Sequence, residues 1–104
     1  MTIIFDENVP WPLRRYFNDH SVTSVQKEGW GGIQNGALIE KIDGRFDVFL
    51  LADKNLRYQQ NLRERKIAII ELPTNRWTLL QQFVPSILAA IQDAKPGSYT
   101  ILEL

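Results

Sequence analysis

Acidic side chains follow two apolar segments of the chain, at the points where these segments end abruptly. The run Thr2–Phe5 is followed by Asp6 and Glu7, and the run Phe46–Ala52 is followed by Asp53. If both runs are neighbouring strands of one parallel sheet, about 4.8 Å apart, the carboxylates of Asp6 and Asp53 converge on one site. Two carboxylates this close repel each other, and a divalent cation that prefers oxygen ligands relieves the repulsion. The pattern therefore predicts a Mg²⁺ or Mn²⁺ site and phosphoryl chemistry.

The same acids also have a purely structural interpretation. Polar residues commonly follow strands, and Asp and Asn are favoured in loops because their side chains hydrogen-bond the nearby backbone. Both interpretations stay open on the sequence alone.

Basic side chains lie in the segments that follow both acidic positions. Arg14 and Arg15 come after the first, and a basic group from Arg57 to Lys66 comes after the second. Cations beside a metal–carboxylate centre would hold an RNA backbone through its phosphates, although a solvated helix face explains them equally well. Trp30, between glycines, is expected to anchor its loop on the core, with stacking on an unpaired base as the alternative.

The pattern of apolar and polar residues predicts the elements that position these side chains. Strands are expected at Thr2–Phe5, Ser21–Val25, Phe46–Ala52, Ile67–Leu72 and Tyr99–Leu102, the last at a sheet edge. Helices are expected at Trp11–Asn18, Gly36–Asp43 and Trp77–Ala94, with a kink at Pro85 and a further helix-compatible segment at Lys54–Glu64. The alternation of strands and helices predicts a three-layer α/β/α fold with a mostly parallel central sheet of about five strands, in a single domain spanning residues 1–104.

Composition limits the partners and the compartment. The chain has 104 residues, no cysteine and a formal net charge of zero. The lack of cysteine excludes disulfides, thiolate zinc sites and a cysteine nucleophile, and it agrees with a cytoplasmic location. Zero net charge means that nucleic-acid binding would have to depend on the local distribution of charge. No run approaches the ~20 apolar residues of a membrane span and the N-terminal segment lacks a basic signal-peptide region, so we expect no membrane partner.

Several segments resemble a known protein family. They are IIFDENVPWPLRRYF, GWGGIQNGALIEKI, FDVFLLADKNLRYQQNL and RKIAIIELPTNRW. Over about residues 2–90 these segments resemble the PIN-like family DUF5615, whose wider superfamily is similar to nucleases of the flap-endonuclease group. The resemblance implies a PIN-like fold, Mg²⁺- or Mn²⁺-dependent ribonuclease activity on RNA, and a role as the toxin of a type II toxin–antitoxin pair with a small antitoxin protein as partner. It is also compatible with a homodimer that joins two half-grooves into one RNA channel.

The resemblance carries over to individual positions only in part. Asp6 matches the first acid of the PIN-like site, and Asp53 matches the acid after the third strand. Two further acids of the family fall on Asn35 and Asn55 here, and asparagine is a neutral and weaker metal ligand. Glu40, further along the second helix, is a candidate substitute only if that helix points at the site.

The predicted site combines the residue pattern and the resemblance. The expected catalytic residues are Asp6, Asp53, Glu7 and Glu40, of which Asp6 and Asp53 are the expected metal ligands. The side chains expected to orient ligands or substrate are Asn8, Asn35, Lys54, Asn55, Arg57 and Arg14.

Two alternatives to a nuclease stay open. With Asn at two acidic positions, the domain could keep the fold and act as a catalytically degenerate binding module for a protein partner. A phospho-receiver domain has a similar fold, with acids after its first and third strands, but it needs a lysine at the end of its fifth strand. Here that strand ends TILEL, and Lys95 precedes it.

Overall fold

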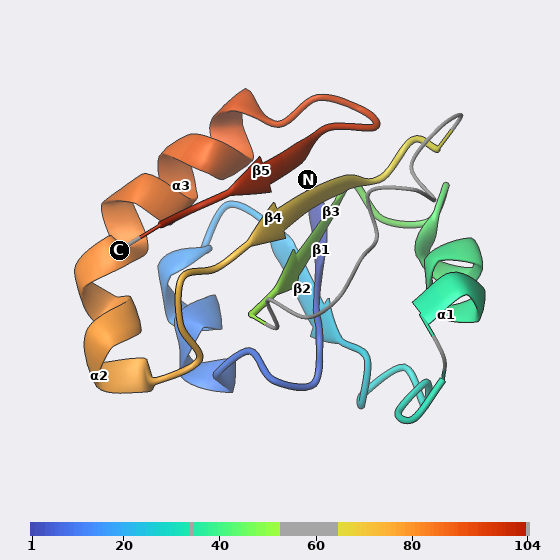
Figure 1. The fold of residues 1–104 in the computed structure, drawn as a ribbon, viewed down its shortest axis with the longest axis horizontal. Coiled ribbons are helices and arrows are strands. Elements are labelled where there is room, and N and C mark those ends of the chain that lie inside the picture. The colour runs from blue at the N-terminus through green and yellow to red at the C-terminus, as the bar shows by residue number, and fades with distance from the viewer. Residues whose placement is uncertain (34, 53–64, 104) are drawn as a thin grey trace.

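The fold is a five-stranded parallel sheet covered by helices on both faces (Figure 1). It is seen in a computed structural model that describes residues 1–33, 35–52 and 65–103. The strands are β1 (Thr2–Phe5), β2 (Ser21–Ser24), β3 (Val48–Leu51), β4 (Ala68–Glu71) and β5 (Tyr99–Ile101). Their order is β2-β1-β3-β4-β5, and every neighbouring pair is parallel. The predicted α/β architecture is confirmed, with β5 at an edge of the sheet.

The helices differ from the expected ones in two places. They are η1 (Trp11–Tyr16), α1 (Asn35–Ile42), α2 (Trp77–Leu80), η3 (Gln81–Phe83) and α3 (Val84–Asp93). The first is a 3₁₀ helix, not an α-helix. The single kinked helix expected at Trp77–Ala94 is instead divided into three, because Pro85 occupies the first turn of α3, where its missing N–H is not needed. None of the helices in the described ranges has the length and apolar character required to cross a bilayer.

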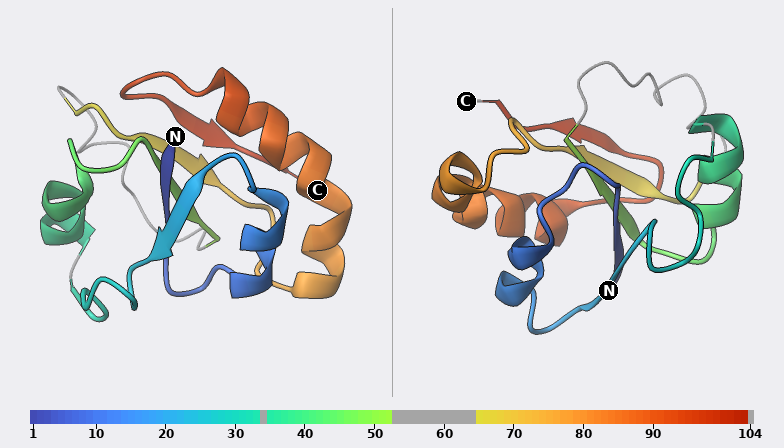
Figure 2. Two further views of the ribbon diagram at one scale, coloured as in Figure 1. Left: turned by 180° about the vertical axis from the view of Figure 1, so that it is seen from behind. Right: turned by 90° about the horizontal axis from the view of Figure 1, so that it is seen from below.

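Alternation along the strands builds a separate core on each face of the sheet. In β1, Ile3 and Phe5 pack beneath η1, α2 and α3, whereas Ile4 packs toward α1. Because successive strand residues point to opposite faces, β3 divides in the same way, with Leu50 on the first side and Phe49 on the second. Figure 2 shows the resulting three layers, with α1 on one side of the sheet and the other helices on the opposite side.

Two aspartates organise the amino ends of the strands. The Asp47 carboxylate accepts hydrogen bonds from the backbone N–H of Thr2 at 2.8 Å and from its hydroxyl at 3.1 Å. The Asp43 carboxylate, after α1, accepts from the backbone N–H groups of Lys66 at 2.7 Å and Ile67 at 2.9 Å. These acids hold the entries to β1 and β4, at the end of the sheet opposite Asp6.

Candidate functional site

The strand order reverses between β1 and β3. The chain proceeds from β1 to β2 on one side, whereas β3 lies on the other side of β1. In open parallel sheets, ligands bind beyond the carboxyl ends of the strands at such a switch point. The two strands pair in parallel up to Phe5 and Leu50, and the Asp6 N–H donates to the Leu50 carbonyl at 2.9 Å. The condition that the strands preceding Asp6 and Asp53 are neighbours is therefore met.

Several predicted site residues lie outside the described part of the chain. Asp53 follows Ala52, which is the last residue described before residue 65. The other predicted site residues beyond the described ranges are Lys54, Asn55 and Arg57. Asn35 is the first residue of α1.

The loop after β1 is tied to the end of β3. The Asp6 carboxylate accepts a hydrogen bond from the Glu7 N–H at 2.9 Å, and the Val9 N–H donates to the Asp6 carbonyl at 3.1 Å. The Ala52 N–H donates to the side-chain oxygen of Asn8 at 3.3 Å. Asn8 therefore acts between the two strand exits, where it fixes the loop that carries Asp6.

Glu7 is held by the glycine loop between β2 and α1. Its Oε1 accepts the N–H of Gly32 at 2.8 Å, and its carbonyl accepts from the Gln26 side chain at 3.2 Å. A Cβ at Gly31 would lie 3.0 Å from the same Oε1, and Gly32 has a φ of +82°, which favours glycine. The carboxylate expected to act in catalysis thus has a structural contact with a loop in which the positive φ of Gly32 favours glycine.

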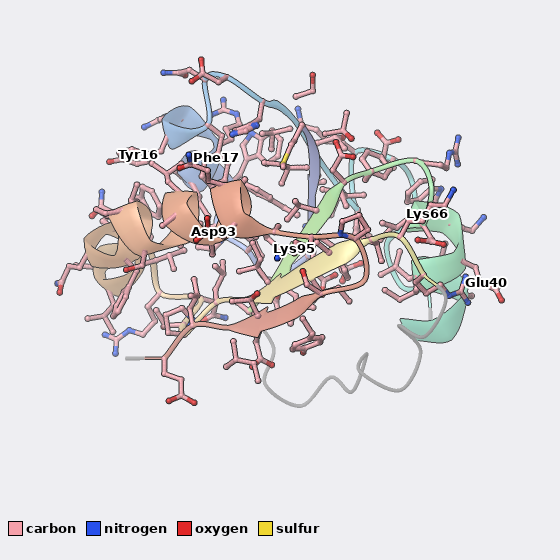
Figure 3. The ribbon with its side chains drawn as sticks, turned by 90° about the horizontal axis from the view of Figure 1, so that it is seen from above. Tyr16, Phe17, Glu40, Lys66, Asp93 and Lys95 are labelled. Atoms are coloured by element: carbon pink, nitrogen blue, oxygen red, sulfur yellow. The ribbon has the colours of Figure 1, made fainter. Side chains whose placement is uncertain are left out.

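Glu40 lies away from Asp6. Because α1 starts after β2 and returns toward the entry of β3, its later residues lie near the amino ends of the strands. The Glu40 carboxylate is 3.8 Å from the guanidinium of Arg65, a residue that precedes β4, and its side chain is 70% exposed. Figure 3 shows Glu40 and Lys66 on the same flank of the molecule. The condition set for Glu40, that its helix points at the site, is not met, so we do not carry it into the proposed site.

The structure adds Glu71, an acid that the sequence interpretation assigned to a buried strand without any functional role. Glu71 is the last residue of β4, pairs with Leu51 of β3, and is only 7% exposed. Its carboxylate accepts one long hydrogen bond, 3.5 Å, from the Tyr99 hydroxyl. In the sequence, Glu71 could have been singled out because it is the one charged residue in the apolar run Ile67–Leu72.

Two acids at the strand ends are candidates for holding a hard cation. Asp6 follows β1 and Glu71 ends β4, and these strands flank β3 on its two sides. No group of three or more potential metal-ligating side chains occurs within the described ranges. A complete carboxylate set would therefore need Asp53, which follows β3 in the sequence. Carboxylate oxygens suit Mg²⁺ and Mn²⁺, so the chemistry of the donors fits such an ion.

Aromatic and basic side chains border the loop after β1. Trp11 packs edge-to-face on Phe5, with ring centroids 5.8 Å apart. The guanidinium of Arg14 lies 5.0 Å from the centroid of the Trp11 ring, and the ammonium of Lys27 lies 4.6 Å from it. Trp30 packs edge-to-face on Phe46 at 6.2 Å and joins the core beneath α1, in agreement with the expected anchor role.

No protein-family model, curated protein or solved structure matches this chain. The PIN-like resemblance therefore depends on the sequence segments quoted above. The strand order β2-β1-β3-β4-β5 is shared by flavodoxin-like sheets, including receiver domains. A receiver is disfavoured because Lys95 precedes β5, whereas the phosphoryl-contacting lysine must follow it.

Proposed function

We propose that this chain is a metal-dependent ribonuclease of PIN-like type and that it serves as the toxin of a toxin–antitoxin pair. The observation that supports the activity is the parallel pairing of β1 with β3, together with the hydrogen bond from Ala52 to Asn8. Through these contacts Asp6 and the chain that continues to Asp53 leave the sheet side by side, at the switch point where ligands of such sheets bind.

Each acid has a distinct part in the proposed site. Asp6 and Asp53 would hold Mg²⁺ or Mn²⁺, and Glu71 is a third carboxylate on the far side of β3. When bound, the ion would lower the pKa of a water molecule and stabilise charge on the phosphodiester oxygens. Glu7 would hold the glycine loop, and Asn8 would fix the loop that carries Asp6.

A specific observation favours a second candidate, a catalytically degenerate binding module. Glu7 and Asn8 both use their side-chain oxygens for structural hydrogen bonds, and Asn occupies positions 35 and 55. A site with so few carboxylates would bind metal weakly. The fold would then present its carboxyl edge to a protein partner, such as a small antitoxin, without cleaving RNA.

Calorimetric titration with Mn²⁺ separates the two candidates. We expect binding to the wild-type protein and loss of binding in Asp6→Asn and in Asp53→Asn. Asp93→Asn is the matched control, because Asp93 is an exposed acid at the end of α3 (Figure 3). Cleavage of structured and unstructured RNA is then measured in the same variants.

Two results would favour the binding module. An absence of Mn²⁺ binding at millimolar concentration contradicts the metal-dependent nuclease. Metal binding without cleavage, followed by a gain of cleavage in the double variant Asn35→Asp and Asn55→Asp, identifies a site that has lost catalysis.

A further inference from the structure

Two cations are gathered on one aromatic ring at the carboxyl edge of the sheet. Arg14 comes from η1 and Lys27 from the turn after β2, yet both lie within 5.0 Å of the centroid of the Trp11 ring. Both distances are within the range of a cation–π contact. The ring itself is anchored on Phe5, the residue before Asp6. The cluster of Trp11, Arg14 and Lys27 therefore borders the proposed site.

Two carboxylates of the loops around Lys27 have other hydrogen-bond partners. Glu28, its neighbour in sequence, accepts a hydrogen bond from the Thr23 hydroxyl at 3.0 Å. Glu7, whose carbonyl accepts from Gln26, has its carboxylate on Gly32 at 2.8 Å. Among the described residues, Arg65 is the only cation found in an ion pair. Neither Arg14 nor Lys27 therefore forms an ion pair with a described carboxylate.

Hydrogen bonds hold the backbone at Lys27 and at Arg14. The Lys27 N–H donates to the hydroxyl of Ser24 at 3.1 Å, and Ser24 is only 7% exposed. The Arg14 carbonyl accepts the Phe17 N–H at 3.0 Å, which closes the end of η1 over a buried side chain. The backbone of Lys27 and Arg14 is thus held by hydrogen bonds, while both residues are exposed to solvent.

We infer that Trp11, Arg14 and Lys27 form a phosphate-binding site for single-stranded RNA, an inference that rests on the proposed ribonuclease function and names its substrate contacts. Both cations contact the same indole ring, whose negative face attracts each of them. Two positive charges brought to one ring attract an anion. We assign this anion to a phosphodiester of the proposed substrate, because the Trp11 ring packs on Phe5, the residue before Asp6.

Binding without metal tests this inference separately from cleavage. The probe is a short fluorescein-labelled oligouridylate, measured by anisotropy in EDTA over a range of NaCl concentrations. The binding constant falls as salt rises, and each lost phosphate contact makes the slope of log K against log [NaCl] less negative by about 0.7 for single strands. This corresponds to about a fivefold loss of affinity at 0.1 M NaCl. We expect this change in Lys27→Gln and in Arg14→Gln, and we expect Lys27→Arg to retain wild-type binding.

Lys95→Gln is the matched control, because it removes the same charge from an exposed residue before β5 (Figure 3). Wild-type binding by Lys27→Gln and Arg14→Gln would overturn the inference, as would an equal loss in Lys95→Gln. Tighter binding of labelled polyglutamate than of the oligouridylate would also overturn it, in favour of an acidic protein segment. If RNA binds through the cluster but Mn²⁺ yields no cleavage, the ribonuclease proposal fails while the phosphate site stands.

Discussion

The side-chain oxygen of Asn8 accepts the backbone N–H of Ala52 at 3.3 Å, across the gap between the ends of β1 and β3. This contact joins residues 44 positions apart in the sequence. It lies at the switch point of the sheet, beside the loop that carries Asp6. The relation makes Asn8 a structural support for the candidate site.

Asn8→Ala is expected to lower the free energy of unfolding by about 1 kcal/mol, because it leaves the partly buried Ala52 N–H without its acceptor. Urea denaturation measures the change. Asn18→Ala removes the same amide from an exposed residue and is expected to leave stability unchanged. Equal stability of both variants would show that water replaces Asn8 without cost.

The contact between Glu7 and Gly32 separates a structural from a catalytic role for Glu7. Glu7→Ala loses the 2.8 Å hydrogen bond and is expected to cost about 1 kcal/mol of stability. Glu7→Gln keeps an oxygen acceptor, so its unfolding free energy and its Mn²⁺ affinity should stay close to wild type. Denaturation and calorimetry test both statements. A folded Glu7→Gln protein that no longer binds Mn²⁺ would instead identify Glu7 as a ligand.

The sequence predicts the strands well because each apolar run ends at a polar residue or, at Pro73, at a proline. The run expected at Phe46–Ala52 becomes the shorter strand Val48–Leu51, since Phe46 forms only an isolated bridge with Asp43. The 3₁₀ geometry of η1 was missed because Leu13 and Phe17 are both buried, and their spacing suits an α-helix equally well. Strand neighbours also depend on topology, which hydropathy does not encode.

The candidate site was harder to predict than the fold. The position of Asp6 at the end of β1 follows from where the apolar run stops, whereas its closeness to the end of β3 depends on the topology. The contact of Glu7 with Gly32 depends on a loop with positive φ and on a tertiary approach across 25 residues, so no local pattern predicts it. Lys27 was missed for the same reason, since its contact with Trp11 joins two different crossovers.

Asp43 should contribute more to stability than any exposed ion pair nearby. Asp43→Ala removes acceptors from the N–H groups of Lys66 and Ile67, and Ile67 is fully buried, so we expect a loss of about 2 kcal/mol. Glu40→Ala, in the preceding helix α1, breaks the solvent-exposed pair with Arg65 and should cost about 0.5 kcal/mol or less. Urea denaturation of the two variants gives the comparison. Similar losses would show that the β4 entry is held by other contacts.

Glu71 is expected to reduce the stability of the metal-free protein. The residue is only 7% exposed, its carboxylate accepts a long hydrogen bond from Tyr99, and it forms no ion pair with a described residue. Burial of such a charge is costly, so Glu71→Gln should raise the free energy of unfolding at neutral pH by about 1 kcal/mol.

Urea denaturation in EDTA and in Mn²⁺ tests whether the Glu71 carboxylate serves the proposed metal site. If the carboxylate serves the proposed metal site, the variant gains stability in EDTA but gains less from added Mn²⁺ than the wild type does, because ligand binding stabilises only the folded state that can bind it. Tyr99→Phe is the control, since it removes the single hydrogen-bond donor and leaves the carboxylate in place. A Glu71→Gln protein that is less stable than wild type in EDTA would show that the buried carboxylate is a net structural contributor, and it would remove the physical reason to regard Glu71 as a residue retained for function.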